Sequence, residues 1–97
     1  MLELEPSKFY LGKNYPGPFN EKTTVKYCIS YKTIVVLRIY NSGRKEISKL
    51  VDEEKPAGNY EVVFSPASGI RLLASGIYFY QLKASEFMVI KKMLLLK

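Results

Sequence analysis

The chain has 97 residues, a formal net charge of +6, one cysteine and no histidine. This length leaves room for one domain, so we expect residues 1–97 to share a single hydrophobic core. One cysteine excludes an intrachain disulfide, and the lack of histidine excludes histidine-based nucleophile pairs and histidine-bound zinc.

Residues 1–8 are expected to form a loose lead-in, and residues 9–11 a short first strand. The first six residues, MLELEP, carry acids where a secretory signal has a basic start followed by an apolar run. No apolar run approaches the ~18 residues of a membrane helix, so we expect no membrane insertion. If the domain is exported, we expect the signal peptide to belong to a longer parent chain.

A proline-rich loop with the sequence NYPGPFN follows at residues 14–20. Pro16 and Pro18 fix φ and lack an N–H donor, so this loop is not expected to join the middle of a sheet. Its candidate motif residues are Tyr15, Pro16, Pro18, Phe19 and Asn20.

Strict alternation of apolar and polar residues predicts a strand from residue 23 to 30. Val25, Tyr27 and Ile29 share one face, and Lys26 and Cys28 share the other. Cys28 is therefore expected to be a half-buried, unreactive thiol, because free cysteines behave as small hydrophobes and no helix end is predicted nearby to activate it.

Residues 33–40, TIVVLRIY, form the most strongly β-forming run, and a turn follows at residues 41–43. Residues 46–51 predict a weaker strand whose apolar residues break the period of two, which indicates a bulged or edge strand. Residues 52–55, DEEK, are expected to form a solvated loop rather than a calcium site. The residues predicted to face inward from the first of these strands are Val35, Leu37 and Ile39.

Two further strands are predicted to open with a Gly-x-Tyr motif, Gly58 to Tyr60 and Gly76 to Tyr78, with residues 66–75 as the long connection between them. Either tyrosine is a candidate tyrosine corner, with plain core packing as the alternative. In the first strand Tyr60, Val62 and Phe64 are predicted to share one face, and in the second Tyr78, Tyr80 and Leu82 are predicted to face inward.

The last strand is predicted over residues 87–96, with a register that Lys91 and Lys92 leave open because they interrupt its alternation. About seven strands with turns every 8–12 residues predict an all-β, immunoglobulin-like or fibronectin III-like antiparallel β-sandwich. The sequence offers no phosphate-binding glycine loop and singles out no carboxylate pair, so we expect no catalysis, cofactor or metal. Its lysines are scattered, which argues against a nucleic-acid partner.

Three motifs carry a family resemblance that covers residues 9–97. They are YPGPFNEKTTVKY at 15–27, LVDEEKPAGNYEVVF at 50–64, and ASGIYFYQLKA at 74–84 running on to KKMLLLK at 91–97. Their order and spacing resemble the type A C-terminal sorting domain of proteins exported by the type IX secretion system of Bacteroidetes-like bacteria. This family looks distantly like the immunoglobulin-like domain of flagellar hook-capping proteins.

The chain departs from the family pattern in its turns. Gly17 stands where the family has Asn, the turn glycine after Tyr40 comes one residue early at Gly43, and Ser65-Pro66 replaces an Asp-Ala pair in a connection that is longer than usual. These departures leave the predicted strands intact.

The resemblance implies a domain fused behind a secreted enzyme or adhesin as its N-terminal cargo. An outer-membrane translocon would recognise it, and a sortase-like peptidase would often remove it as the cargo is attached to the cell surface or released. The tail KKMLLLK is the candidate segment for recognition by the translocon. Leu95 is expected to pack in the core, and the lysines are expected to be the residues that the translocon recognises. An ordinary final strand is the alternative. The candidate residues are Lys91, Lys92, Met93, Leu94, Leu95, Leu96 and Lys97.

The sorting hypothesis predicts that deletion of residues 91–97 abolishes export without loss of folding. A second hypothesis is a structural immunoglobulin-like spacer or assembly domain of a surface or filament protein, which would self-associate. A third is carbohydrate binding through exposed aromatic residues, for which the candidates are Tyr15, Phe19, Tyr31 and Tyr40.

Overall fold

The alternating segments of the sequence form seven β-strands in the computed structural model, which describes residues 8–65 and 73–96. Most of the predicted lead-in, most of the 66–75 connection and Lys97 lie outside the described residues. Within the described residues, no helix is long and apolar enough to cross a membrane. The strands are β1 (Tyr10–Leu11), β2 (Thr23–Ile29), β3 (Thr33–Tyr40), β4 (Glu46–Lys55), β5 (Gly58–Phe64), β6 (Gly76–Ala84) and β7 (Phe87–Leu95).

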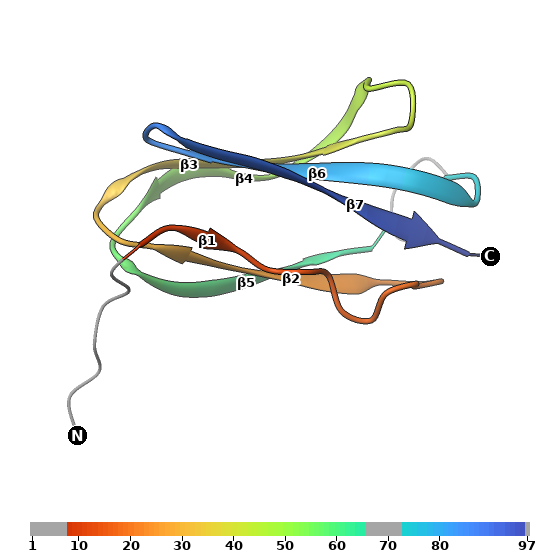
Figure 1. Cartoon of the computed structure of the whole chain (residues 1–97), viewed down its shortest axis with the longest axis horizontal. Coiled ribbons are helices and arrows are strands. Elements are labelled where there is room, and N and C mark those ends of the chain that lie inside the picture. The colour runs from red at the N-terminus through yellow and green to blue at the C-terminus, as the bar shows by residue number, and fades with distance from the viewer. Residues whose placement is uncertain (1–7, 66–72, 97) are drawn as a thin grey trace.

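The strands build two sheets, one with the order β1-β2-β5 and the other with the order β4-β3-β6-β7. Every neighbouring pair within a sheet is antiparallel. Figure 1 shows the two sheets stacked face to face as two layers. The predicted all-β sandwich is therefore confirmed. The fourth strand lies beside the third instead of in the sheet of the first, which is the fibronectin III-like variant of the immunoglobulin arrangement.

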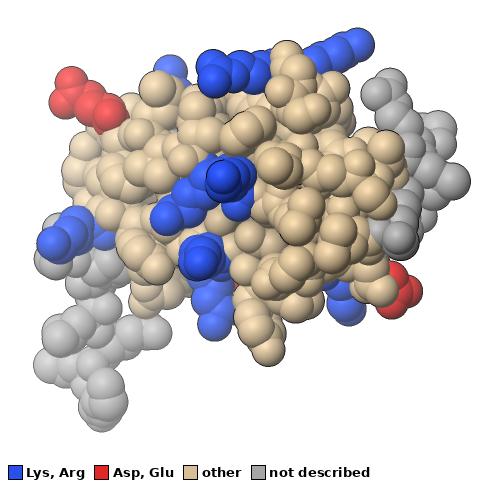
Figure 2. All heavy atoms as spheres, turned by 45° about the vertical axis from the view of Figure 1, so that its right-hand side comes forward, with Lys and Arg blue, Asp and Glu red and all other residues tan. Residues whose placement is uncertain are grey.

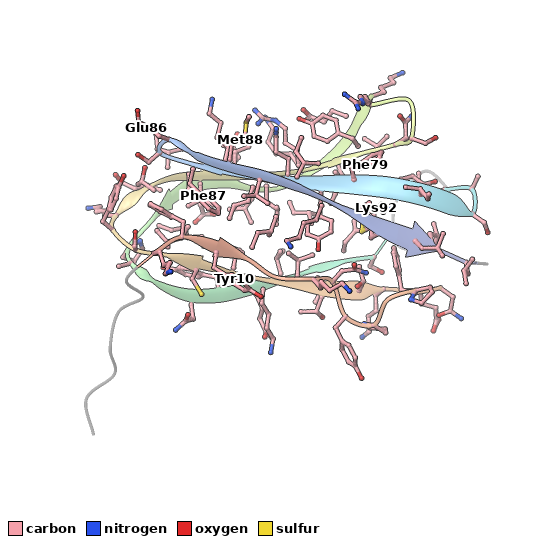
Figure 3. All side chains as sticks on the ribbon, in the orientation of Figure 1. Tyr10, Phe79, Glu86, Phe87, Met88 and Lys92 are labelled. Carbon is pink, nitrogen blue, oxygen red and sulfur yellow. The ribbon has the colours of Figure 1, made fainter. Side chains whose placement is uncertain are left out.

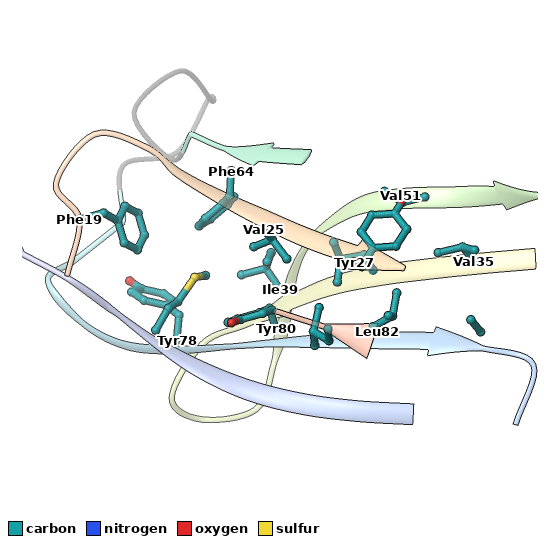
Figure 4. Packing of buried hydrophobic residues seen from close by; sticks show 14 of the residues in the cluster. Phe19, Val25, Tyr27, Val35, Ile39, Val51, Phe64, Tyr78, Tyr80 and Leu82 are labelled. Carbon is teal, nitrogen blue, oxygen red and sulfur yellow. The ribbon is translucent and has the colours of Figure 1, made fainter. Parts of the chain in front are cut away.

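The core fills the space between the sheets (Figure 4). It consists of the inward-facing residues of the alternating strands, because a period of two places one residue in every two on the buried face. Burial of each such aliphatic or aromatic side chain contributes roughly 1.5–3 kcal/mol. The predicted inward faces of β3 and β6 are confirmed, and the residues predicted to share one face of β2 and of β5 are the ones that face the core. The fully buried hydrophobic residues include Val25, Ile29, Val35, Leu37, Ile39, Tyr80, Leu82 and Leu95.

The prediction of a charged loop at residues 52–55 is wrong, because β4 continues through it to Lys55. The ladder with β3 pairs Asp52, Glu53 and Glu54 with Val36, Val35 and Ile34, respectively. Charged residues are tolerated here because β4 is an edge strand and its carboxylates stay hydrated. The prediction of a bulged or edge strand is confirmed, since the register shifts twice along β3 and β4.

The turn between β3 and β4 extends one residue further than the predicted 41–43. The Asn41 N–H donates to the Lys45 carbonyl oxygen over 3.0 Å, and the Arg44 N–H donates to the Asn41 carbonyl oxygen over 2.9 Å. Arg44 adopts a left-handed φ of 68°, a conformation in which glycine is normally found. The early position of Gly43 therefore leaves an arginine where the turn would favour glycine.

The register of the last strand is now defined. Met93 and Leu95 face the core, whereas Met88, Ile90, Lys92 and Leu94 lie on the outer face. Lys91 lies on the same side of β7 as the inward-facing Met93 and Leu95, and it is half-buried at the edge of the sheet. Figure 3 shows Phe87 and Met88 on opposite sides of β7.

Candidate recognition surface between the proline loop and strand β7

The two motifs furthest apart in the sequence, the loop at residues 14–20 and the C-terminal tail, lie side by side. At one end of the loop, Tyr15 and Thr24 of β2 exchange two backbone hydrogen bonds of 2.9 and 2.7 Å. At the other end, the Phe19 N–H donates to the Leu94 carbonyl oxygen over 3.0 Å, and the Leu96 N–H donates to the Phe19 carbonyl oxygen over 2.8 Å. The loop therefore ties the three-stranded sheet to the end of the four-stranded sheet.

Phe19 anchors this connection from the inside. Its side chain is only 3% exposed and meets Phe64 edge-to-face with ring centroids 6.2 Å apart. The carbohydrate-binding hypothesis counted Phe19 as an exposed aromatic residue, and that prediction is wrong. An aromatic residue directly after Pro18, in a loop without alternation, gave no periodic signal of burial, so only the fold reveals that Phe19 belongs to the core.

The other end of the loop is held by a group of polar contacts that the sequence did not single out. The Asn14 side-chain amide donates to Thr23 Oγ1 over 2.9 Å, and Thr23 Oγ1 donates to the Pro16 carbonyl oxygen over 2.9 Å. The buried Tyr80 hydroxyl donates to the Gly12 carbonyl oxygen over 2.8 Å and accepts from the Asn14 N–H over 3.0 Å. The tendency of Asn to bond nearby backbone in turns was the signal that could have identified Asn14.

Burial raises the pKa of Tyr80, so its hydroxyl keeps its proton and its donor role. Gly17 fits close to the Asn14 side chain, because a Cβ added at residue 17 would lie 3.2 Å from Asn14 Nδ2. The Asn-to-Gly departure from the family pattern therefore falls where the loop packs tightly against its own first residue.

Between the loop and β7 lies an open groove of about 760 Å³. Ile77 and Leu94, which face each other across the β6–β7 ladder, are 44% and 36% exposed and provide apolar surface. Tyr15 is 79% exposed. The residues that line the groove are Lys13, Asn14, Tyr15, Gly17 and Pro18 from the loop side and Ile77, Lys92, Met93 and Leu94 from the strands.

The groove is basic as well as apolar. Lys13 and Lys92 both line it, and neither forms an ion pair with another described residue. Figure 2 turns the C-terminal end of the molecule forward and shows Lys and Arg side chains spread over this face, with Asp and Glu at its margins. An apolar groove flanked by lysines is suited to an extended partner segment that carries apolar and acidic side chains.

The residues of the C-terminal tail differ in how deeply they are buried. Met93 and Leu95 are 3% and 0% exposed, so the prediction that Leu95 packs in the core is confirmed. Leu94 and Leu96 are exposed, so the accessible surface of the tail includes leucines as well as lysines. Lys91 and Lys92 point to opposite sides of the sheet and do not form one patch. Lys97 lies outside the described residues.

Deletion of residues 91–97 would remove Met93 and Leu95 from the core. We therefore predict that such a truncation also destabilises the fold, because loss of each buried side chain of this size typically costs about 2–5 kcal/mol. Substitution of exposed residues is the appropriate test.

Both Gly-x-Tyr motifs form tyrosine corners. The Tyr60 hydroxyl donates to the Pro56 carbonyl oxygen and the Tyr78 hydroxyl to the Ala74 carbonyl oxygen, each over 2.6 Å. Core packing applies as well, since Tyr78 is 6% exposed and Tyr60 stacks on Tyr27 with centroids 5.3 Å apart. These tyrosines fix the entries into β5 and β6, and they do not line the groove.

The remaining aromatic candidates do not form a common platform. Tyr31 donates to Ser85 Oγ over 2.7 Å at the β6–β7 turn, whereas Tyr40 donates to Gln81 Oε1 over 3.0 Å on the outer face of the four-stranded sheet. The Cys28 thiol is half-buried, as predicted, and lies 2.9 Å from Asn59 Oδ1. Residues 8–65 and 73–96 contain no group of three or more Cys, Asp or Glu side chains placed to hold a metal ion.

No known family model, curated protein or solved structure matches this chain.

Proposed function

We propose that this chain is a non-catalytic C-terminal sorting domain that addresses a fused cargo protein to the type IX secretion translocon, for release or attachment at the cell surface. The observation that carries the proposal is the groove shared by the proline loop and β7. The loop motif and the tail motif of the resemblance lie at opposite ends of the sequence, yet both line this groove.

The chemistry of the groove supports recognition by a protein partner. The exposed Leu94 and Ile77 offer apolar contact, and Lys13 and Lys92 offer positive charge at its rim. Apolar contacts supply most of the affinity of such a surface, whereas the lysines increase the rate of encounter with an acidic partner. In this proposal a component of the translocon binds the groove, and a sortase-like peptidase cleaves the chain between the cargo and this domain.

The test uses a reporter that carries a signal peptide, fused in front of this chain and expressed in a type IX-competent host. Leu94→Glu removes apolar contact from the groove and places a negative charge beside Lys13 and Lys92, so it is expected to weaken recognition on the order of tenfold. Val63→Glu is the matched control, because Val63 is 50% exposed on β5, in the other sheet. The measurement is the fraction of reporter that added protease digests on intact cells.

The proposal predicts that Leu94→Glu lowers the surface fraction while Val63→Glu does not, with both domains melting within a few degrees of the unmodified chain. Lys92→Glu, on the rim of the groove, is expected to act in the same direction. Equal surface fractions for Leu94→Glu and Val63→Glu would exclude the groove as the surface that the translocon recognises. A reporter that stays in the periplasm with the unmodified domain would instead favour the structural spacer.

A further inference from the structure

The four-stranded sheet has two open edges of opposite charge. Its order places β4 at one edge and β7 at the other. Edge strands present unpaired N–H and C=O groups that can pair with a further strand. Near its exposed edge β4 carries Asp52, Glu53 and Glu54, whereas β7 carries Lys91 and Lys92.

The free part of the β7 edge is short and well defined. Phe19 pairs with the backbone of Leu94 and Leu96, which shows that the even-numbered residues of β7 direct their N–H and C=O groups away from β6. By alternation, Met88, Ile90 and Lys92 present the same groups to solvent, and no described residue pairs with them. The loop at Phe19 closes the edge beyond them.

The free part of the β4 edge has a matching length. Hydrogen-bonded and non-hydrogen-bonded pairs alternate along each ladder, and this alternation can be followed from β7 through β6 and β3 to β4. The backbone groups of Val51, Glu53 and Lys55 bond to β3, whereas those of Asp52 and Glu54 point outward. Before Val51 the register shifts, so the regular edge covers residues 51–55. A bulge bends a strand and ends regular pairing, which limits the available edge on that side.

We infer that the β7 edge of one chain binds the β4 edge of a second copy of the same chain. Neighbouring strands in β4-β3-β6-β7 are all antiparallel, so β4 and β7 of one chain run in opposite directions. A second copy placed beside the first in the same orientation therefore brings an antiparallel β4 against β7. In β7 and in the regular stretch 51–55 of β4 the even-numbered residues lie on the outer face, so the core faces of the two copies coincide along these stretches.

One register satisfies the charges on both faces. With Ile90 opposite Glu54, Lys92 lies opposite Asp52 on the outer face and Lys91 lies opposite Glu53 on the inner side. Directly opposed unlike charges stabilise an antiparallel pair, and like charges destabilise it. In the present chain Asp52 forms an exposed ion pair of 3.4 Å with Lys49, and Glu53 forms one of 3.3 Å with Lys55, whose side chain is half-buried and lies over the Tyr60 ring. An exposed pair such as that of Asp52 contributes little and is readily exchanged.

The two registers that differ from this one by two residues keep the outward groups paired but place the charges less favourably. A slip by two residues in one direction places Lys91 opposite Lys55, and a slip in the other direction places Lys92 opposite Leu50 at the bulge. In the favoured register Leu50, at the bulge, falls opposite Leu94, whose outward carbonyl is already bonded to Phe19, so regular pairing between the copies ends at Lys92 and Asp52. The charges and the length of the free edges therefore favour the same alignment.

The contact joins unlike edges, so each copy keeps one free edge of each kind after pairing. Such a heterologous contact allows open chains instead of closed dimers. Pairing of two β4 edges would bring acids together, and the β7 stretch from Met88 to Lys92 contains no acid to meet its own lysines. This inference does not depend on the proposed sorting function.

The test measures the mass of the purified full chain by analytical ultracentrifugation over a range of protein and salt concentrations. The mean mass is expected to rise with protein concentration and to fall towards the monomer mass in about 0.5 M salt, because exposed charges are screened. Lys91→Glu/Lys92→Glu and Asp52→Lys/Glu53→Lys are each expected to weaken association on the order of tenfold.

A mixture of the two charge-reversed variants provides the decisive comparison, because each then offers an edge that complements the other. The inference predicts that the equimolar mixture regains association that neither variant shows alone. A monomeric unmodified chain at low salt, undiminished association of either variant, or a mixture that stays monomeric would each overturn it.

A second pair of variants tests the strand edge itself without changing charge. Ile90→Pro removes an N–H that points to solvent, a position at which edge strands tolerate proline, whereas Ile90→Thr keeps the N–H. The inference predicts loss of association for Ile90→Pro and not for Ile90→Thr, with both variants showing the circular dichroism of the unmodified chain. Equal association of the two would contradict strand pairing.

Discussion

Phe19 connects the proline loop to both the core and β7, so its truncation tests whether the loop is part of the folded structure. The side chain is 3% exposed and packs against Phe64. Phe→Ala in a core typically costs about 3–5 kcal/mol, of which the aromatic pair supplies about 0.5–1.5 kcal/mol. A domain of this size has roughly 5–15 kcal/mol of stability, so Phe19→Ala is expected to remove a large part of it.

The assay is urea unfolding followed by circular dichroism at 25 °C. Phe19→Leu, which keeps most of the buried volume, is expected to cost about 1–1.5 kcal/mol and stays measurable if the alanine variant is largely unfolded. Tyr15→Ala is the matched control from the same loop, because its side chain is 79% exposed and its backbone bonds to Thr24 remain possible. Its cost is expected to stay within about 0.5 kcal/mol.

Hydrogen exchange gives a second readout at the site itself. The Leu96 N–H donates to the Phe19 carbonyl oxygen, so its exchange should accelerate in Phe19→Ala more than that of β3 amides. A cost below about 1 kcal/mol for Phe19→Ala, or equal costs for Phe19→Ala and Tyr15→Ala, would refute the account of Phe19 as the anchor of the groove.

Three further predictions concern the sandwich. Burial raises the pKa of Tyr27 from 10.0 to about 12, so its stabilising contribution is complete below pH 10 and is lost as pH rises towards 12. Urea unfolding should therefore show a loss of about 1 kcal/mol between pH 9 and 11 that Tyr27→Phe removes. Arg44→Gly should raise the free energy of unfolding by about 0.5–1 kcal/mol, because it relieves the left-handed φ, and an unchanged urea midpoint would count against strain there. Tyr78→Phe should cost about 1 kcal/mol in the same assay, and more than Tyr60→Phe, because the corner of Tyr78 is the more buried.

Much of the fold could be predicted because one face of each central strand is buried. In β2 and β3 every second residue is apolar, from Val25 to Ile29 and from Val35 to Ile39, and these residues form the core. The edge strands lack this constraint. Residues 52–55 were predicted to form a loop because their run of charges resembles a solvated turn, but an edge strand can also keep such charges hydrated. Lys91 obscured the register of β7 because it occupies an inward-facing position at a sheet edge.

The candidate site could be predicted only in part. The sequence singled out both the proline loop and the tail, but nothing local indicated that Phe19 would pair with β7, since that contact spans almost the whole chain. The roles of Asn14 and Tyr80 depend on the same long-range arrangement. The exposed Leu94 could be identified only after the buried Met93 and Leu95 had fixed the register.

The proposed function requires that this domain alone directs a cargo across the outer membrane through the type IX translocon. The most direct measurement compares the protease-accessible fraction of a signal-peptide–reporter–domain fusion in two otherwise identical hosts, with and without the outer-membrane translocon. Sorting by this domain predicts surface reporter in the first host and periplasmic reporter in the second. Periplasmic reporter in both hosts, or surface reporter in both, would contradict it.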